Sequence, residues 1–117
     1  MKITHLGAQA SGTALKRLMN EYDHFHWAVA WATETGLSTA FLQHGKKIAY
    51  LVVGTDFDHT SPKLLRKLLP LKKAHVAASK PRATFHPKVY GFVSGQKAAV
   101  LVGSSNFTNG GTHTNQE

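Results

Sequence analysis

The sequence predicts an α/β fold in which a mixed β-sheet is flanked by helices. Amphipathic helical segments alternate along the chain with short, nearly continuous apolar runs, a pattern typical of strands that are covered by helices. The last two apolar runs are too close together for a crossover connection, so they form a hairpin and the sheet contains antiparallel as well as parallel pairs. A chain of 117 residues can bury one core. We therefore expect residues 1–117 to be one domain.

Two helices and two strands are expected in the first half of the chain. Residues 13–22 place four large side chains at helical spacing, and residues 25–32 (FHWAVAWA) have the aromatic and β-branched composition of a buried strand. A second helix over residues 36–44 ends at Gly45, which is suited to cap it. Residues 47–53 (KIAYLVV) form a strong buried strand.

The second half begins with a clear helix start at Ser61-Pro62. Serine caps a first turn, and proline fits within it because its missing N–H needs no partner there. Leucines supply the buried face of this helix, and Pro70 limits its length. A weaker strand over residues 74–78 precedes the basic loop Lys80-Pro81-Arg82.

A hairpin follows over residues 89–102. If Gly95-Gln96-Lys97 is its loop, four polar side chains lie on one face at its open end, in two facing pairs: Lys88 with Ser104, and His86 with Asn106. A loop of different length would turn the second strand over, because strand side chains alternate between faces. Pro87 cannot donate a ladder hydrogen bond, so it marks a strand start, an edge or a bulge.

The four groups at this open end suit a phosphate ligand. Lysine supplies a positive charge, serine and asparagine donate hydrogen bonds to phosphoryl oxygens, and histidine can attack phosphorus or transfer protons near neutral pH. Gly103 would allow the backbone to approach closely. For His86 and Lys88 alone, an exposed strand end is the ordinary explanation. The phosphate interpretation depends on the whole set.

Composition favours a polyanionic partner. Fourteen Lys and Arg residues against six Asp and Glu give a formal charge of +8, which suits nucleic acid first and an anionic membrane second. A basic surface without a specific partner explains the charge equally well. The chain has no cysteine, no apolar run of membrane-spanning length and no hydrophobic block at its N-terminus. We expect a cytoplasmic protein.

The polar groups of the hairpin also resemble a known signature. His86-Pro87-Lys88, followed by Gly103-Ser104-Ser105-Asn106, is similar to the H-x-K…G-S-x-N signature of the phospholipase D superfamily. Phe107-Thr108 and Asn115-Gln116-Glu117 extend the resemblance to its nuclease branch, which includes bacterial restriction-type endonucleases. The resemblance covers about the last quarter of the chain. It implies the family's α/β sandwich and a metal-independent phosphodiesterase that acts on nucleic acid, DNA before RNA.

The resemblance also implies a mechanism and an assembly. Family members with a single signature pair as homodimers, so that two H-x-K elements share one active site. One His86 would form a phosphohistidine, and the other would protonate the leaving oxygen. The transferred phosphoryl oxygens would be stabilised by Lys88 and Asn106 with help from Ser104, and Glu117 would orient a histidine ring. No metal and no cofactor are implied.

Two positions complicate the resemblance. Many members have an aspartate five residues after the lysine, where this chain has Val93, a departure that disfavours the phospholipase branch and raises the question of weakened catalysis. Glu117 is the final residue, and a catalytic carboxylate at a bare terminus would tend to fray. We therefore expect the chain to be a fragment of a longer protein or the core of a multidomain enzyme.

Other interpretations of the polar residues stay open. Five residues could together bind a divalent cation: His24, His26, Asp56, Asp58 and His59. A polar strand entry and a helix start explain the same residues as well. Lys80 and Arg82 are the expected nucleic-acid contacts, and the basic cluster around the leucine-rich helix is either a second contact or a solvated face. Trp27, Trp31 and Phe107 are expected in the core. The competing functions are a non-catalytic nucleic-acid-binding module and a phospholipid phosphodiesterase.

Overall fold

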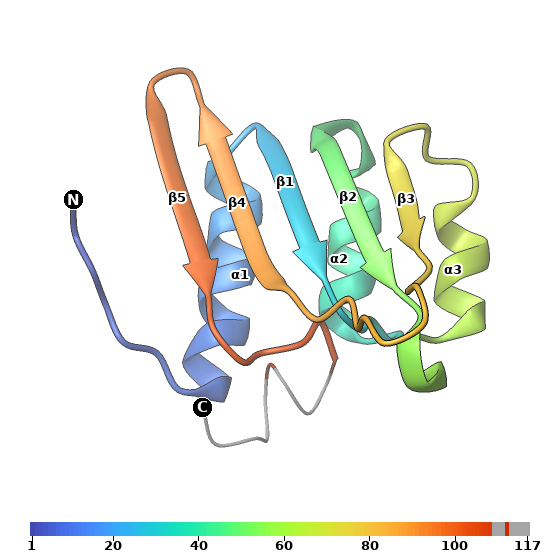
Figure 1. The fold of residues 1–117 in the computed structure, drawn as a ribbon. Coiled ribbons are helices and arrows are strands. Elements are labelled where there is room, and N and C mark those ends of the chain that lie inside the picture. Colours follow the sequence, from blue (N-terminus) through green and yellow to red (C-terminus); the bar gives the residue numbers. More distant parts are fainter. Residues whose placement is uncertain (109–111, 113–117) are drawn as a thin grey trace.

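The described residues form a five-stranded sheet that is covered on one face by three helices (Figure 1). The computed structural model describes residues 1–108 and residue 112. The elements follow the order α1 (Ala8–Glu21), β1 (His24–Val29), α2 (Gly36–Gln43), β2 (Ile48–Gly54), α3 (Pro62–Leu68), β3 (Ala74–Ala77), β4 (Lys88–Ser94) and β5 (Lys97–Val102), with 3₁₀ turns at Gly45–Lys47 and Asp56–Asp58. The predicted α/β class is confirmed, and each expected helix and strand is present.

The sheet is mixed, as the sequence predicts. Its strand order is β3-β2-β1-β4-β5. Strands β1, β2 and β3 are parallel neighbours, whereas β4 is antiparallel to both β1 and β5. The connection from β3 to β4 passes the carboxyl ends of β2 and β1, so that β4 pairs with β1 on the side away from β2 (Figure 1). This connection places the start of β4 beside the end of β1.

The two faces of the sheet have different surroundings. Phe25, Trp27 and Val29 of β1 are buried on the face that carries the helices, together with Tyr90 and Phe92 of β4. The opposite face has no helix over it in the part of the chain that the structure describes (Figure 1). Its side chains include His26, Tyr50 and His75, all exposed.

An aromatic cluster forms the centre of the core. The Trp27 ring stacks on Phe41 of α2 with centroids 4.5 Å apart, and it meets the edges of Tyr90 and Phe107 at 5.0 and 5.1 Å. Such arrangements are favoured because the positive edge of one ring meets the negative face of another. The expected core positions of Trp27 and Phe107 are confirmed, and Phe107 thereby fixes the segment that follows β5.

The helix starts follow local capping chemistry. Thr35 and Ser38 form a reciprocal capping box at α2, and the Ser61 hydroxyl accepts a hydrogen bond from the Leu64 N–H at α3. No helix among the described residues has the length and apolar character needed to cross a bilayer.

Helix α1 begins five residues earlier than its large apolar side chains predict. Its first turns bury the small residues Ala8, Ser11 and Gly12, which give no periodic signal in the sequence. A side chain at Gly12 would place its Cβ 2.6 Å from the carbonyl oxygen of Thr112. The absence of a side chain at Gly12 therefore allows α1 to pack directly against the backbone at Thr112.

The predicted hairpin register is wrong by one residue. The turn consists of Gly95 and Gln96 alone, and Ser94 pairs with Lys97. Gly95 has φ of 57°, a left-handed conformation that glycine adopts without a steric penalty and that two-residue hairpin turns require. The shorter turn places Gly103, not Ser104, opposite Lys88, because Val89 pairs with Val102 in the preceding position.

Candidate active site

Four segments meet at the carboxyl ends of β1 and β2, where β4 begins. The predicted strand over residues 25–32 leaves the sheet after Val29, and the Ala30 N–H donates to the Pro87 carbonyl at 2.7 Å. Trp31 and Thr33 exchange backbone hydrogen bonds with Phe107, at 3.1 and 3.0 Å. In open α/β sheets, ligands bind beyond the carboxyl ends of the strands where the strand order reverses, and β1 lies at such a position here.

His86 and Lys88 converge at this end. The Lys88 Nζ atom lies 2.6 Å from Nδ1 and 2.9 Å from Nε2 of His86, and it donates to the His86 carbonyl at 3.2 Å. The lone-pair directions of the two ring nitrogens diverge, so one ammonium cannot donate linearly to both. These distances show the ammonium group and the imidazole ring occupying one site.

Local backbone chemistry explains this placement. Pro87 cannot join the ladder, so β4 begins at Lys88, which pairs with Val29 of β1. Its side chain lies on the helix-covered face and is 8% exposed, whereas His86 stands outside the sheet and is exposed. The prediction of a strand start at Pro87 is confirmed.

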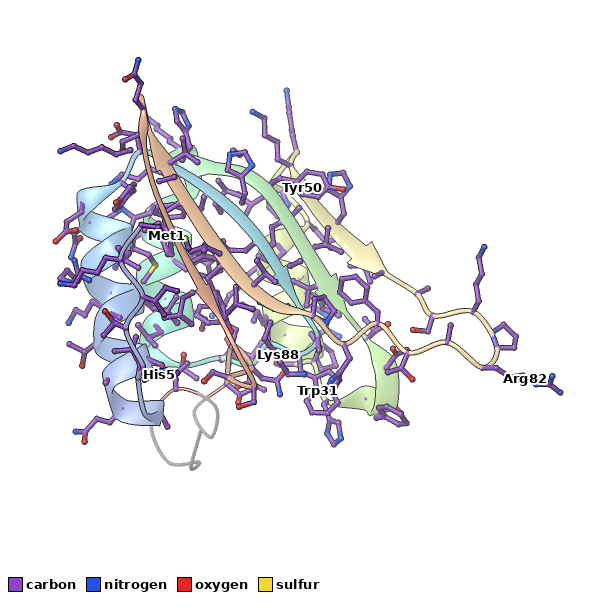
Figure 2. The ribbon with its side chains drawn as sticks, turned by 60° about the vertical axis from the view of Figure 1, so that its left-hand side comes forward. Met1, His5, Trp31, Tyr50, Arg82 and Lys88 are labelled. Carbon is purple, nitrogen blue, oxygen red and sulfur yellow. The ribbon has the colours of Figure 1, made fainter. Side chains whose placement is uncertain are left out.

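Trp31 forms one wall of the site. Its indole ring meets the His86 ring at 5.0 Å and the His59 ring at 4.5 Å, both edge to face, and Lys88 Nζ lies 5.7 Å from the indole. Trp31 and Lys88 lie close together in Figure 2. The prediction that Trp31 is a core residue is therefore incomplete, since its ring is half-buried and faces the polar groups. The sequence contains no signal for this role, because the predicted strand over residues 25–32 includes Trp31, whereas β1 ends at Val29.

The second half of the signature reaches the same end of the sheet. The Gly103 N–H approaches the Lys88 carbonyl at 3.4 Å, and the Ser105 carbonyl accepts a hydrogen bond from the Tyr90 hydroxyl at 2.8 Å. Ser104 is exposed, whereas Ser105 is buried and packs locally.

Asn106 is the partly buried polar residue of this segment. Its side-chain Oδ1 atom is buried without a hydrogen-bond partner among residues 1–108 and 112. A buried polar atom without a partner costs about 1–3 kcal/mol, so Asn106 Oδ1 is a candidate to bind a ligand group.

Other predicted site residues are not part of this convergence. Lys80 and Arg82 lie on an exposed loop, and Arg82 is at its tip, far from Lys88 and Trp31 (Figure 2). Glu117 lies outside the described residues. Val93 pairs with His24 and Ala98 near the hairpin turn, about 17 Å along β4 from Lys88 at 3.3–3.4 Å per residue. A valine there removes no group from the site.

The residues considered for a cation are distributed over separate regions. The imidazoles of His24 and His26 belong to β1 and face away from the helices. The Asp56 carboxylate instead accepts hydrogen bonds from the Ser79 hydroxyl at 2.5 Å and the Phe85 N–H at 2.8 Å, which fixes the chain just before His86. Within the described ranges, no group of three or more His, Cys, Asp or Glu residues could hold a metal ion.

The basic cluster of α3 is partly neutralised. Lys67 and Lys63 pair with Glu34 at 2.6 and 3.6 Å, and the hydrogen bond from Lys67 is the main cause that lowers the pKa of Glu34 below its usual value. This face of α3 thus binds the loop before α2. That arrangement supports the solvated-face interpretation more than a phosphate contact for Lys63 and Lys67.

No protein-family model matches the chain, and no curated protein matches it in sequence.

Proposed function

We propose that this protein is a phospholipase D-like phosphodiesterase that cleaves nucleic acid, DNA in the first place, without a metal ion. The convergence of His86 and Lys88 within 2.6 Å at the start of β4 is the observation that carries the proposal. Backbone hydrogen bonds from Gly103 to Lys88 and from Phe107 to Trp31 support the proposal, because they hold both ends of the second half of the signature at this end of the sheet. A net charge of +8 suits a polyanionic substrate.

The proposed reaction has two steps. A ring nitrogen of His86 attacks phosphorus, the bond from phosphorus to the leaving oxygen breaks, and a phosphohistidine forms. A second histidine protonates the leaving oxygen and then removes a proton from the water that releases the phosphate. Lys88, Asn106 and Ser104 stabilise the charge on the phosphoryl oxygens.

The second histidine in this proposal comes from another copy of the chain. In this proposal the two copies meet at this end of the sheet, where His86 and Ser104 are exposed. The family's sandwich belongs to the same proposal, and the described residues supply its sheet and one helix layer. The proposal also includes Glu117 as the carboxylate that orients a histidine ring. It further includes a restriction-type role in the cytoplasm.

Cleavage in excess EDTA tests the proposal. Plasmid DNA and a labelled single-stranded oligonucleotide are incubated with the wild-type protein and with His86→Ala, and the solution mass of each protein is measured. We expect cleavage that persists in EDTA, disappears in His86→Ala and leaves a base-stable, acid-labile phosphate label on the wild-type protein. Cleavage that requires a divalent metal would overturn the mechanism. Binding without cleavage would instead show a non-catalytic nucleic-acid-binding module.

A further inference from the structure

The turn after β2 presents an aromatic side chain in a strained conformation. Phe57 and Asp58 have φ values of 59° and 54°, in the left-handed region that a bulky residue such as phenylalanine rarely adopts. Backbone strain of this kind persists only where surrounding structure imposes it, and it is concentrated at binding sites. The result is that the Phe57 side chain is 69% exposed.

Hydrogen bonds on both sides hold this turn in place. Thr60, which is buried, donates to the Gly54 carbonyl at 2.7 Å and accepts from the Ala32 N–H at 3.2 Å. The Asp56 carboxylate is hydrogen-bonded to Ser79 and Phe85, as described above. The display of Phe57 is therefore a fixed feature of the fold, although the ring contributes little to the core.

The exposed ring continues a series of rings that ends at His86. Phe57 lies 6.4 Å from Trp31 and 6.3 Å from His59, and Trp31 in turn contacts His86 at 5.0 Å. We call Trp31, Phe57 and His59 the aromatic shelf. The Trp31 Nε1 atom is buried there and has no hydrogen-bond partner in the described part of the chain. The shelf thus extends from the Trp31 ring, whose centroid lies 5.7 Å from the Lys88 ammonium group, to the exposed ring of Phe57.

A nucleotide fits both parts of this surface. Its phosphate suits the cationic and hydrogen-bonding groups at His86 and Lys88, and its base can stack on exposed rings. A base in a duplex is already paired and stacked between its neighbours, so only an unpaired base can present a face to the shelf.

We propose that the aromatic shelf is a stacking subsite for an unpaired base next to the scissile phosphate, so that single-stranded segments of nucleic acid are bound in preference to duplex. This assignment rests on the proposed function for the position of the phosphate. The shelf sets the preference for single strands, while His86 and Lys88 act on the phosphodiester.

Binding measured without turnover tests the shelf separately from the chemistry. The His86→Ala protein is titrated with three labelled probes: a thymidine hexanucleotide, a hexamer of abasic phosphodiester units and a twelve-base-pair duplex. Fluorescence anisotropy gives the affinities at one fixed salt concentration, because phosphate contacts depend on salt. We expect the thymidine strand to bind about tenfold more tightly than the abasic strand, since stacking contributes about that factor per base.

Variants of Phe57 assign that difference to the shelf. In the same background, Phe57→Ala should reduce the affinity for the thymidine strand about tenfold and leave the affinity for the abasic strand unchanged. Phe57→Trp should keep the full affinity for the thymidine strand, because tryptophan also stacks on bases. Tyr50→Ala is the matched control, because Tyr50 is also an exposed ring but lies on the uncovered sheet face. Circular dichroism confirms that each variant is folded.

The outcomes distinguish the two proposals. Equal affinity for thymidine and abasic strands, a preference for the duplex, or an equal loss in Tyr50→Ala would overturn the stacking subsite. A base-dependent loss confined to Phe57→Ala would support it even if the wild-type protein cleaved nothing, and in that case only the catalytic proposal would fail.

Discussion

The two ends of the sheet contain similar residue types in very different arrangements. At the end opposite the candidate site, His24 begins β1 and Lys97 begins β5, and a shallow depression is lined partly by Lys46, Lys72 and Lys73. At the site end, the carboxyl ends of parallel strands and the start of β4 meet, and His86 and Lys88 share one location. Histidine and lysine are thus common in this chain, but backbone topology determines where they converge.

Exchanging histidine for alanine at each end should give the largest difference. We expect His86→Ala to reduce the rate of oligonucleotide cleavage about 10³-fold or more, because it removes the attacking nitrogen. His24→Ala should stay within about twofold of wild type, since it alters only an exposed strand residue. Single-turnover rates in EDTA measure both. If both variants lost cleavage rate equally, the two ends of the sheet would not differ in function.

Replacing lysine should have the next largest effect. Lys88→Met keeps most of the buried side-chain volume but removes the charge beside His86, and we expect a loss of about 10²-fold in kcat/KM. Lys97→Met, on the exposed start of β5, is the matched control and should change the rate less than about twofold. If both variants lose activity alike, Lys88 contributes general charge and no specific contact.

The contact between α1 and the segment after the signature should affect stability. Gly12→Ala forces a methyl group against the Thr112 backbone, and we expect it to lower the free energy of unfolding by about 1–3 kcal/mol. Gly36→Ala has open space around its new Cβ and should be neutral or stabilising by up to about 1 kcal/mol. Urea denaturation measures both. A stable Gly12→Ala protein would show that Thr112 does not pack closely against α1.

The ion pairs of Glu34 should give the smallest effect. The pKa of Glu34 is lowered in the folded state, so its contribution to stability is present above the unfolded value of 4.5 and is lost as pH falls through the lower folded value. Glu34→Gln should therefore lower the Tm slightly at pH 6 and leave it unchanged at pH 3. The difference should shrink in high salt, because the pairs are solvent-accessible. A Tm difference that is independent of pH would contradict this account.

Periodic apolar patterns predicted the fold well because burial follows them directly. Ser61-Pro62 and the run over residues 48–54 have both the correct pattern and the correct boundary chemistry. The start of α1 was missed, since its buried face there consists of Ala8, Ser11 and Gly12, whose small side chains do not resemble a hydrophobic stripe.

The candidate site was only partly predictable for a different reason. The spacing of His86 and Lys88, two residues apart, predicted that their side chains share one location, although His86 lies before the start of β4. The facing pairs were placed one residue out of register, because a glycine such as Gly95 suits both a two-residue and a three-residue hairpin turn, and the sequence does not distinguish the two. Trp31 and Phe57 were missed because their proximity depends on how loops after two different strands approach each other, which spacing along the sequence does not encode.

The central position of β1 has a consequence for the order of folding. On one side β1 pairs with β2, which follows within 30 residues, but on the other side it pairs with β4, whose residues come about 60 positions later. During synthesis, a chain that ends before residue 88 could assemble the three parallel strands, yet one edge of β1 would stay unpaired. Docking of the β4–β5 hairpin completes the sheet and brings His86 to Trp31 in the same event. The candidate site is therefore assembled only when the domain is, and no partly folded nascent chain would contain it.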